Sequence, residues 1–203
     1  MIHLLKKPPR KLFYLACSGG IDSMVAMDFL LKGGHNFKLI NINHGTDYGE
    51  KASFFLKEIS KKYNIELLLF KPKRAIHTNE SPEEYWRNLR YEIFHNCKLP
   101  IVTAHHLDDV VEWWILSSLC GKPKLTPYKN KNVIRPFLLT SKQQIINWSL
   151  KNSIEYIEDP SNKSNKYMRN IVRNKIMPYA IKINPGIRKV IRKKLLDVKY
   201  SDL

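Results

Sequence analysis

Apolar and polar positions alternate regularly along residues 12–119. Short apolar runs of strand length are each followed by a longer segment whose apolar positions recur at helical spacing. The expected strands are 13–15, 37–43, 65–70 and 100–104, and the expected helices are 24–31, 50–63, 83–97 and 107–119. Ser81 is the expected N-cap of the third helix, with Pro82 in its first turn. This order predicts an α/β fold with a doubly wound parallel sheet, which binds ligands outside the carboxyl ends of its strands.

The second part of the chain is less regular. Residues 121–136 are rich in Pro, Lys and Asn, which is typical of a loop. A helix is expected over residues 141–152. A further helix follows the polar turn at 158–162, and it is expected to end at Met177 because Pro178 cannot continue it.

The last expected element is a basic helix over residues 184–198. It leaves no segment for a second hydrophobic core. We therefore expect one α/β domain over residues 1–178 and a short, basic, helical C-terminal extension over residues 179–203.

The chain is strongly basic. Its 203 residues include 35 Lys and Arg against 18 Asp and Glu, a formal net charge of +17. Residues 163–203 alone hold twelve Lys and Arg against two Asp, a net charge of +10. A lysine-rich proteome would raise the charge without a partner, but it would not concentrate the charge in one segment. The pattern favours a nucleic acid bound by this segment, through Arg188, Lys189, Arg192 and Lys193.

The three cysteines, Cys17, Cys97 and Cys120, are scattered and lack metal-ligand spacing. This usage indicates reduced thiols, and we expect a cytoplasmic protein. No apolar run has the roughly 20 residues of a membrane span, and Met1–Arg10 has no signal-peptide pattern.

The segment Ser18-Gly19-Gly20-Ile21-Asp22-Ser23 joins the first expected strand to the first helix. Its glycines permit backbone angles that other residues resist, and the helix start directs backbone N–H groups and its dipole at an anion. The two serines add hydroxyl donors. The segment predicts a phosphate-binding loop, with an ordinary capped glycine turn as the alternative.

A second cluster, Thr103–Glu112, carries five ionisable side chains where a strand meets a helix. Asp109 and Glu112 are separated by three positions and Asp108 and Glu112 by four, so two carboxylates share one helix face. Such a pair binds a cation, either Mg²⁺ on ATP or an ammonium group. The alternative is a helix with acidic residues in its first turn, which the helix dipole favours. The histidines lack the further ligands of a zinc site.

A third cluster follows the turn at 158–162. Arg169 and Arg173 lie one helical turn apart, and they can present two guanidinium groups to phosphate or carboxylate. A solvated basic helix is the alternative.

Together these clusters resemble the PP-loop, or N-type, ATP pyrophosphatases, and among them the tRNA(Ile)-lysidine synthetase family. The phosphate loop has the Ser-Gly-Gly-x-Asp-Ser pattern and lacks the lysine of the Walker P-loop. Further matching blocks follow in the family's order within residues 12–178: Asn43-His44-Gly45, 87–91, 103–112, Arg135-Pro136-Phe137 and 158–173. The resemblance implies the adenine nucleotide α-hydrolase-like fold and cleavage of ATP to AMP and pyrophosphate.

The resemblance also implies a two-step ligation. The C2 carbonyl of the wobble cytidine of a tRNA(Ile) attacks the α-phosphate of ATP, with Mg²⁺ present. The ε-amine of free lysine then displaces AMP. The tRNA is expected to bind by its anticodon arm.

Roles for individual residues follow from the clusters and the resemblance. Catalytic roles are expected for Asp22, Asp109, Glu112 and Arg169. ATP contacts are expected for Ser18, Gly19, Gly20, Ile21, Asp22, Ser23, His44 and His105. Substrate contacts are expected for Arg87, Asp108, Asn170, Arg173, Arg188, Lys189, Arg192 and Lys193.

Three features depart from the family pattern. Trp113 stands where threonine is usual, and Thr46-Asp47 stands where Leu-Arg is usual. The chain is also expected to be a short form that lacks the family's C-terminal tRNA-binding domains. Two other functions remain open: a different PP-loop tRNA modifier such as a thiolase, which would use cysteines, and a non-catalytic tRNA-binding protein.

Overall fold

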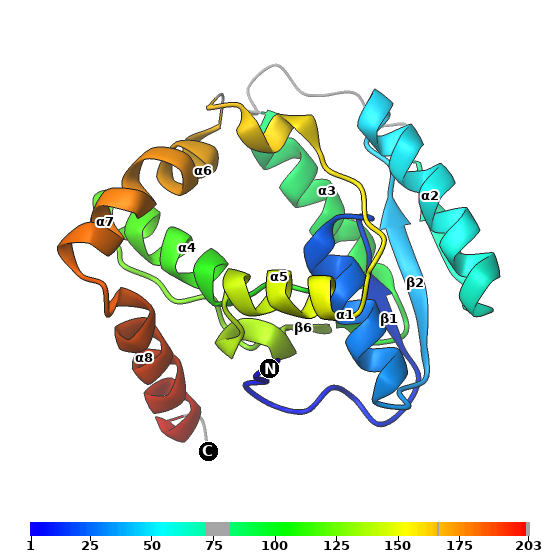
Figure 1. The fold of residues 1–203 in the computed structure, drawn as a ribbon, viewed down its shortest axis with the longest axis horizontal. Coiled ribbons are helices and arrows are strands. Elements are labelled where there is room, and N and C mark those ends of the chain that lie inside the picture. Colours follow the sequence, from blue (N-terminus) through cyan, green and yellow to red (C-terminus); the bar gives the residue numbers. More distant parts are fainter. Residues whose placement is uncertain (72–81, 166, 202–203) are drawn as a thin grey trace.

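The computed structural model of the chain describes residues 1–71, 82–165 and 167–201. The described residues form a six-stranded sheet with the strand order β3-β2-β1-β4-β6-β5. The strands are β1 (Phe13–Ala16), β2 (Phe37–Ile42), β3 (Leu67–Phe70), β4 (Ile101–Val102), β5 (Lys129–Asn130) and β6 (Val133–Ile134). The α-helices are α1 (Ile21–Lys32), α2 (Asp47–Tyr63), α3 (Pro82–Asn96), α4 (Leu107–Leu119), α5 (Lys142–Lys151), α6 (Met168–Ile171), α7 (Met177–Ile183) and α8 (Ile187–Ser201). Figure 1 shows their arrangement.

The sheet is parallel from β3 to β6. β1 lies between β2 and β4, and both pairs are parallel, as are the pairs β2 with β3 and β4 with β6. The predicted doubly wound α/β fold is therefore confirmed. The expected helix starts shift slightly, since α1 begins at Ile21 and α2 at Asp47, where the Thr46 side chain caps the helix. The proposed cap Ser81 lies outside the described residues.

The prediction that residues 121–136 form only a loop is wrong. It contains β5 and β6, which pair antiparallel with each other and close this edge of the sheet. Val133 and Ile134 form too short an apolar pair to give a strand pattern in the sequence. They are held by pairing with Ile101 and Val102, which a sequence-local pattern does not contain.

Alternating side chains of the strands face two different helical layers. Phe13, Leu15 and Leu39 pack with residues of α1, α2 and α5 in one buried cluster. Ile40 and Ile101 pack with residues of α3 in another cluster on the opposite face. Both faces of the sheet are thus covered, which fixes the carboxyl ends of the strands as the open edge.

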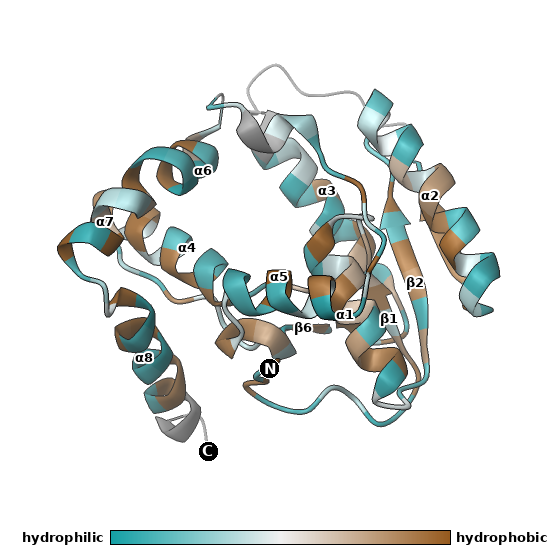
Figure 2. Cartoon of the chain, viewed as in Figure 1, coloured by the Kyte–Doolittle hydropathy of each residue, from teal (hydrophilic) through white to brown (hydrophobic). Residues whose placement is uncertain are grey.

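A third hydrophobic cluster joins α4, α7 and α8 with the 3-10 segment Pro136–Leu139. Helix α8 buries Ile187, Ile191 and Leu195 there, one residue about every four, which is the spacing of a helix face. Figure 2 accordingly shows brown and teal residues alternating along α8. The expected basic helix is present, and it packs against α4 through its apolar face.

The prediction that a helix ends at Met177, before Pro178, is also wrong. A π-helical segment, Val172–Ile176, follows α6, and α7 continues directly from it with Pro178 in its first turn. Proline is tolerated there because the first N–H groups of a helix need no intrahelical acceptor.

A search of the described helices finds none with the length and apolarity needed to cross a membrane.

The packing of α8 predicts an unequal response of two adjacent residues. Ile191 is fully buried against α4, whereas Val190 keeps 43% of its surface exposed. Ile191→Ala should lower the free energy of unfolding by about 2–5 kcal/mol, and the control Val190→Ala should change it by less than about 0.5 kcal/mol. Urea unfolding followed by circular dichroism measures both values. Equal costs would contradict the docking of α8.

Candidate functional site

The phosphate loop connects β1 to α1 at the open edge of the sheet. Gly19 has a φ of +78°, and a Cβ there would lie 3.2 Å from the side chains of Ile157 and Phe55. Gly20 is the N-cap of α1 and makes no side-chain cap bond, so the first N–H groups of the helix have no side-chain cap to satisfy them. Ser23 Oγ donates to the Gly20 carbonyl at 2.9 Å and accepts from the Ser18 N–H at 3.2 Å. This geometry is what the prediction of an anion-binding loop requires.

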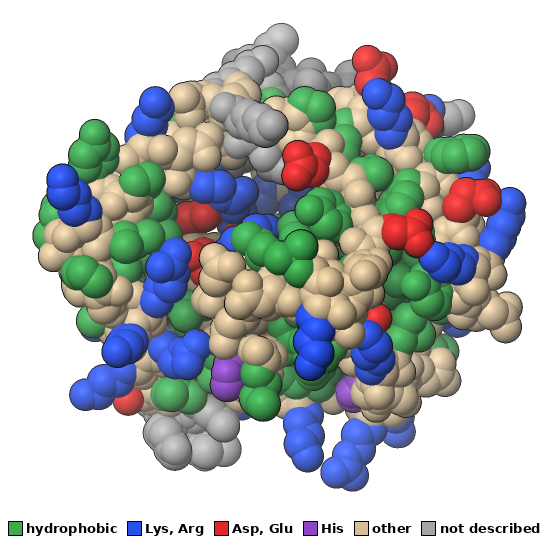
Figure 3. All heavy atoms as spheres, viewed as in Figure 1, with side chains coloured by type: hydrophobic (Ala, Val, Ile, Leu, Met, Phe, Trp, Pro, Cys, Tyr) green, Lys and Arg blue, Asp and Glu red, His purple; other side chains and the backbone are tan. Residues whose placement is uncertain are grey.

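A cavity of about 410 Å³, the first cavity, opens beside this loop. Its walls come from the loop, from the ends of β2 and β4, and from α3 and α6. Figure 3 shows a hollow near the middle of the view, with acidic and basic side chains in its wall. Predicted site residues that line it are Ser18, Asp22, Ser23, His44, Arg87, His105, Asp109, Arg169, Asn170 and Arg173.

Asp109 and Glu112 do hold cations, and these are two arginines of the same chain. Arg169 donates to Asp109 at 2.8 Å and lies 3.4 Å from Glu112. Arg173 donates to both Glu112 oxygens at 2.8 and 2.9 Å and to Asp109 at 3.2 Å. We call these four residues the acid–arginine network. It ties α4 to α6 and to the π-helical segment.

Asp22 is the carboxylate nearest to the phosphate loop. It is partly exposed, and its Oδ1 lies 2.5 Å from Lys142 Nζ and 3.5 Å from His106 Nε2. His106 is buried as the N-cap of α4, where it forms a capping box with Asp109. A single chain of contacts therefore runs from the phosphate loop through His106 to the acid–arginine network.

Asp108 points away from the first cavity. It accepts from the Lys142 N–H at 2.8 Å and from the Arg188 guanidinium at 2.6 and 2.8 Å. Together with Glu112 and Arg173 it lines a second cavity of about 420 Å³. Apolar side chains of Met177, Pro178 and Ile181 complete the lining of this second cavity.

The two histidines expected to contact ATP lie at the first cavity and have lowered pKa values. Burial lowers the pKa of His44 to about 4, and Arg90 lowers it further. Burial likewise lowers the pKa of His105 to about 3, against the opposite influence of Asp109. His105 shares a 2.8 Å hydrogen bond with Thr103, and the His44 ring packs at a tilt against Trp86, with 4.4 Å between ring centroids. Both rings are neutral near pH 7.

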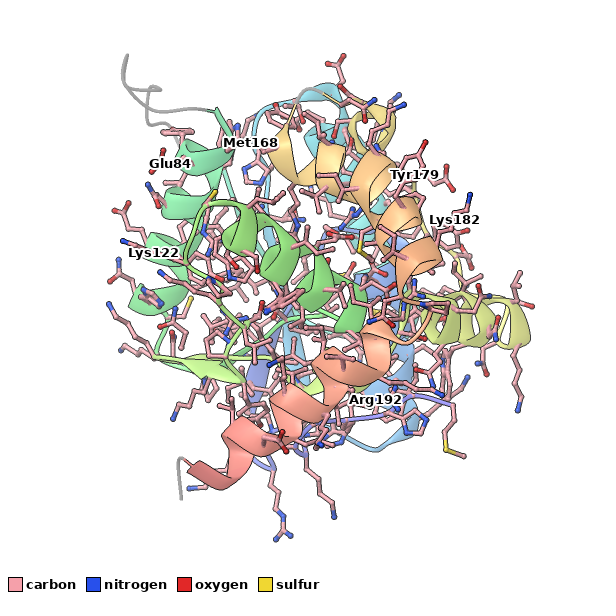
Figure 4. All side chains as sticks on the ribbon, turned by 90° about the vertical axis from the view of Figure 1, so that its left-hand side faces the viewer. Glu84, Lys122, Met168, Tyr179, Lys182 and Arg192 are labelled. Carbon is pink, nitrogen blue, oxygen red and sulfur yellow. The ribbon has the colours of Figure 1, made fainter. Side chains whose placement is uncertain are left out.

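The expected nucleic-acid residues of α8 divide into two groups. Arg188 is paired with Asp108, and Arg192 donates to the Leu139 carbonyl at 2.8 Å. Lys189 and Lys193 are exposed. Figure 4 shows α8 across this side of the molecule, below α7. Both arginines therefore have contacts within the chain, and the expectation that all four residues contact a nucleic acid stays a prediction.

Three residues at these cavities were missed by the sequence reasoning. Arg90 lines the first cavity, Lys142 bridges Asp22 and the second cavity, and His106 caps α4 beside the network. A signal existed for Arg90, which lies in the matching segment 87–91. No local pattern marks Lys142, since its partner Asp22 is 120 positions away.

The described residues contain no group of three or more His, Cys, Asp or Glu side chains that could hold a metal ion. Mg²⁺ in nucleotide enzymes takes one or two carboxylates together with phosphate oxygens and water. Asp22, partly exposed beside the loop, fits that part of a Mg²⁺ site. Its present partner is the Lys142 ammonium, which a divalent cation would replace.

The lowered pKa of His44 predicts a loss of stability in acid. The unfolded chain protonates this histidine near pH 6.5, whereas the folded chain keeps it neutral down to about pH 4. Its contribution to stability is therefore complete above about pH 6.5 and falls as the pH drops toward 4. His44→Phe keeps an aromatic ring beside Trp86. It should reduce the slope of the unfolding free energy against pH by an amount equivalent to up to about one bound proton. Urea unfolding at a series of pH values measures the slope, and an unchanged slope would refute the assignment.

Known proteins that resemble this chain agree with the fold and the loop described above. A family model described as a PP-loop domain matches residues 1–180. A curated tRNA(Ile)-lysidine synthase of Actinobacillus pleuropneumoniae serotype 3 (strain JL03) is 31% identical over 183 residues, covering 84% of this chain and 43% of the relative. Another, of Buchnera aphidicola subsp. Schizaphis graminum, is 32% identical over 192 residues, covering 86% and 43%.

The chain thus spans less than half the length of these curated relatives. Among solved structures, an NH3-dependent NAD synthetase from Campylobacter jejuni is similar with a TM-score of 0.49 and 9% identity, over 97% of this chain and 88% of that one. The match over residues 1–180 includes the phosphate loop, both cavities' α4 residues and the acid–arginine network. The chain belongs to the PP-loop domain family.

Proposed function

We propose that the chain carries the adenylation and ligation site of a tRNA(Ile)-lysidine synthetase. It would join lysine to C2 of the wobble cytidine through an adenylated tRNA and release AMP and pyrophosphate. The observation that carries the proposal is the pairing of two cavities across the acid–arginine network, one beside the phosphate loop and one lined like an amino-acid site. The similarity to curated lysidine synthases supports it.

The first cavity suits the adenylation step. The phosphate loop would hold the β- and γ-phosphates at the N-terminus of α1, where N–H groups and dipole favour an anion. The C2 carbonyl oxygen of cytidine would then bond to the α-phosphorus as the bond to the β-phosphate oxygen breaks. Asp22 would help to hold Mg²⁺, which neutralises phosphate charge when it is bound.

The second cavity suits a free amino acid with a long aliphatic side chain. Asp108 and Glu112 line it, and an ammonium group would replace their present partners Arg188 and Arg173. Arg188, released from Asp108, would then pair with a carboxylate. Met177 and Ile181 give an apolar surface for methylene groups. Arg173 lines both cavities, so an amine in the second cavity reaches the first only past this side chain.

The two carboxylates of the network have different roles in the proposal. Burial alone would raise the pKa of Asp109, but His106 and Arg169 lower it far below its usual range. Asp109 is therefore a poor proton acceptor, and it would orient the arginines or the incoming ammonium instead. In the second step the ε-nitrogen loses a proton and bonds to C2 while the C2–O bond to AMP breaks. Glu112, which lines the second cavity, is the proposed acceptor of that proton.

A tRNA thiolase is disfavoured by the cysteine beside the loop. Cys17 is buried, and burial raises the pKa of its thiol, so the reactive thiolate form is suppressed. A non-catalytic tRNA-binding protein would have no use for a phosphate loop open to an anion. The lysidine reaction accounts for both the loop and the second cavity.

Product analysis tests the proposal directly. The protein is incubated with ATP, Mg²⁺, lysine and tRNA(Ile), and nucleosides and nucleotides are identified by mass spectrometry. We expect lysidine in the tRNA together with AMP and pyrophosphate, and Asp22→Ala should reduce turnover roughly a hundredfold or more. ADP and phosphate as tRNA-dependent products would reject the assignment. A second PP-loop tRNA modification would show as a different modified nucleoside.

Glu112→Gln should separate the two steps. It removes the proposed proton acceptor and leaves the phosphate loop intact, so adenylated tRNA should accumulate while lysine transfer falls by roughly two orders of magnitude. The exposed Glu58→Gln on α2 is the control and should behave like the wild type. Thermal melting of both variants checks that the fold survives. If adenylation itself fails in folded Glu112→Gln, the carboxylate serves the nucleotide rather than the amine.

A further inference from the structure

The acidic side chains of the first cavity are already neutralised by neighbours. Asp109 is paired with Arg169 at 2.8 Å and with Arg173 at 3.2 Å. Asp22 is paired with Lys142 at 2.5 Å. The carboxylates that line this cavity therefore already have cationic partners in the free protein.

Two arginines of α3 line the same cavity without a carboxylate partner among the described residues. Arg87 lies over the rings of Tyr91 and Trp113, at 5.3 and 5.6 Å. No hydrogen bond or ion pair joins Arg90 to any other residue that the structure describes. Burial lowers the pKa of Arg90, and the like charges of Arg169 and Arg87 lower it further. A guanidinium placed in this way is costly in the free protein unless an anion joins it.

Another arginine shows what a structural role looks like in this chain. Arg135 is 2% exposed and donates to the Pro127 carbonyl and to the Tyr91 hydroxyl, both at 2.9 Å. Both of its terminal nitrogens thus have fixed acceptors in the fold, and only its Nε lacks one among the described atoms. Arg90, one residue before Tyr91, has no such acceptor and faces the cavity instead.

The surroundings of Arg90 also favour an anion over a neutral ligand. The nearby His44 is neutral because burial and Arg90 itself lower its pKa, and its buried Nδ1 has no hydrogen-bond partner among the described atoms. Arg87 contacts ring faces rather than a carboxylate, and cation–π contacts leave the charge of a guanidinium in place. Two guanidinium groups and an unpaired ring nitrogen thus share one wall of the cavity.

We propose that Arg90, with Arg87 beside it, forms an anion subsite that receives a phosphate group at the α3 wall of the first cavity, apart from the phosphate loop. The phosphate could belong to the nucleotide or to the RNA backbone, since both present the same oxygens. The inference rests on the proposed function for its choice of ligands. It assigns Arg90 a direct contact with substrate, and it explains why an unpaired cation is kept there.

The test uses Arg90→Met, which keeps the aliphatic stem and removes the charge, and Arg90→Lys, which keeps the charge. Arg135→Met is the matched control for a buried arginine. Thermal melting is measured for each protein alone, and calorimetry gives the affinities for ATP, pyrophosphate and an anticodon stem-loop RNA. Arg90→Met should melt at or above the wild-type temperature and should bind its phosphate ligand roughly 10- to 100-fold more weakly. Arg90→Lys should recover part of that affinity, while Arg135→Met should melt lower and bind normally.

Each outcome decides the inference. Weaker binding of ATP and pyrophosphate places a nucleotide phosphate at Arg90, and weaker binding of the RNA alone places a backbone phosphate there. Unchanged affinity for all three ligands overturns the subsite, as does a loss of melting temperature equal to that of Arg135→Met. If the wild type binds RNA but neither ATP nor pyrophosphate, the proposed function fails, and the RNA measurement still tests Arg90.

Discussion

The acid–arginine network is the interaction on which the rest of the site depends. Two carboxylates on α4 meet two guanidinium groups from α6 and the π-helical segment, 57 to 64 positions later in the chain. Glu112 is almost wholly enclosed, and a carboxylate in that position is tolerable only because Arg173 binds both of its oxygens. Asp109 and Arg169 line the first cavity, Glu112 lines the second and Arg173 lines both, so the network stands between the two cavities and joins α6 and the π-helical segment to α4. Its stability contribution is modest for such pairs, since the guanidinium groups keep about a third of their surface in water. Its larger effect is on position, because it holds in place the side chains that lie between the two cavities.

The π-helical segment fits this constraint. Arg173 lies within Val172–Ile176, and a π turn adds one residue to the turn compared with an α-helix. On a regular α-helix, residues four positions apart, as Arg169 and Arg173 are, lie one above the other on the same face. Both arginines contact Asp109 and Glu112, while Val172 beside them is buried in the cluster with α4 and α8. The wider turn lies at the point where Arg173 contacts the network and Val172 packs into the hydrophobic cluster, and α7 continues from it with a proline in its first turn.

Much of this architecture could be predicted from the sequence, and the limits have a physical reason. The parallel strands and their helices have local signatures, namely apolar runs, helical spacing and a glycine pair at a tight turn. Strand β6 escaped prediction because two residues carry no period, and pairing with β4 decides its conformation. The clusters at Ser18–Ser23 and at Thr103–Glu112 were visible as densities of functional side chains. Their partners were not, since Lys142 lies 120 positions after Asp22 and Arg188 lies 80 positions after Asp108.

The distribution of positive charge shows the same limit in another form. Residues 163–203 carry a net charge of +10, which suggested a continuous RNA surface, but the fold divides this charge by residue type. Arg169, Arg173 and Arg188 make ion pairs within the chain, and Arg192 binds a backbone carbonyl. Lys182, Lys189, Lys193 and Lys194 are exposed. A planar guanidinium can bind two oxygens at once, which suits the fixed geometry of an interior, whereas a strongly hydrated ammonium is cheaper to leave in water. The positive charge that this segment leaves exposed is therefore carried mainly by its lysines, and under the proposed function it would attract RNA through phosphates without reading the bases. Under the proposed function, selection of the reacting base would then fall to the cavities, where the guanidinium groups are held in place.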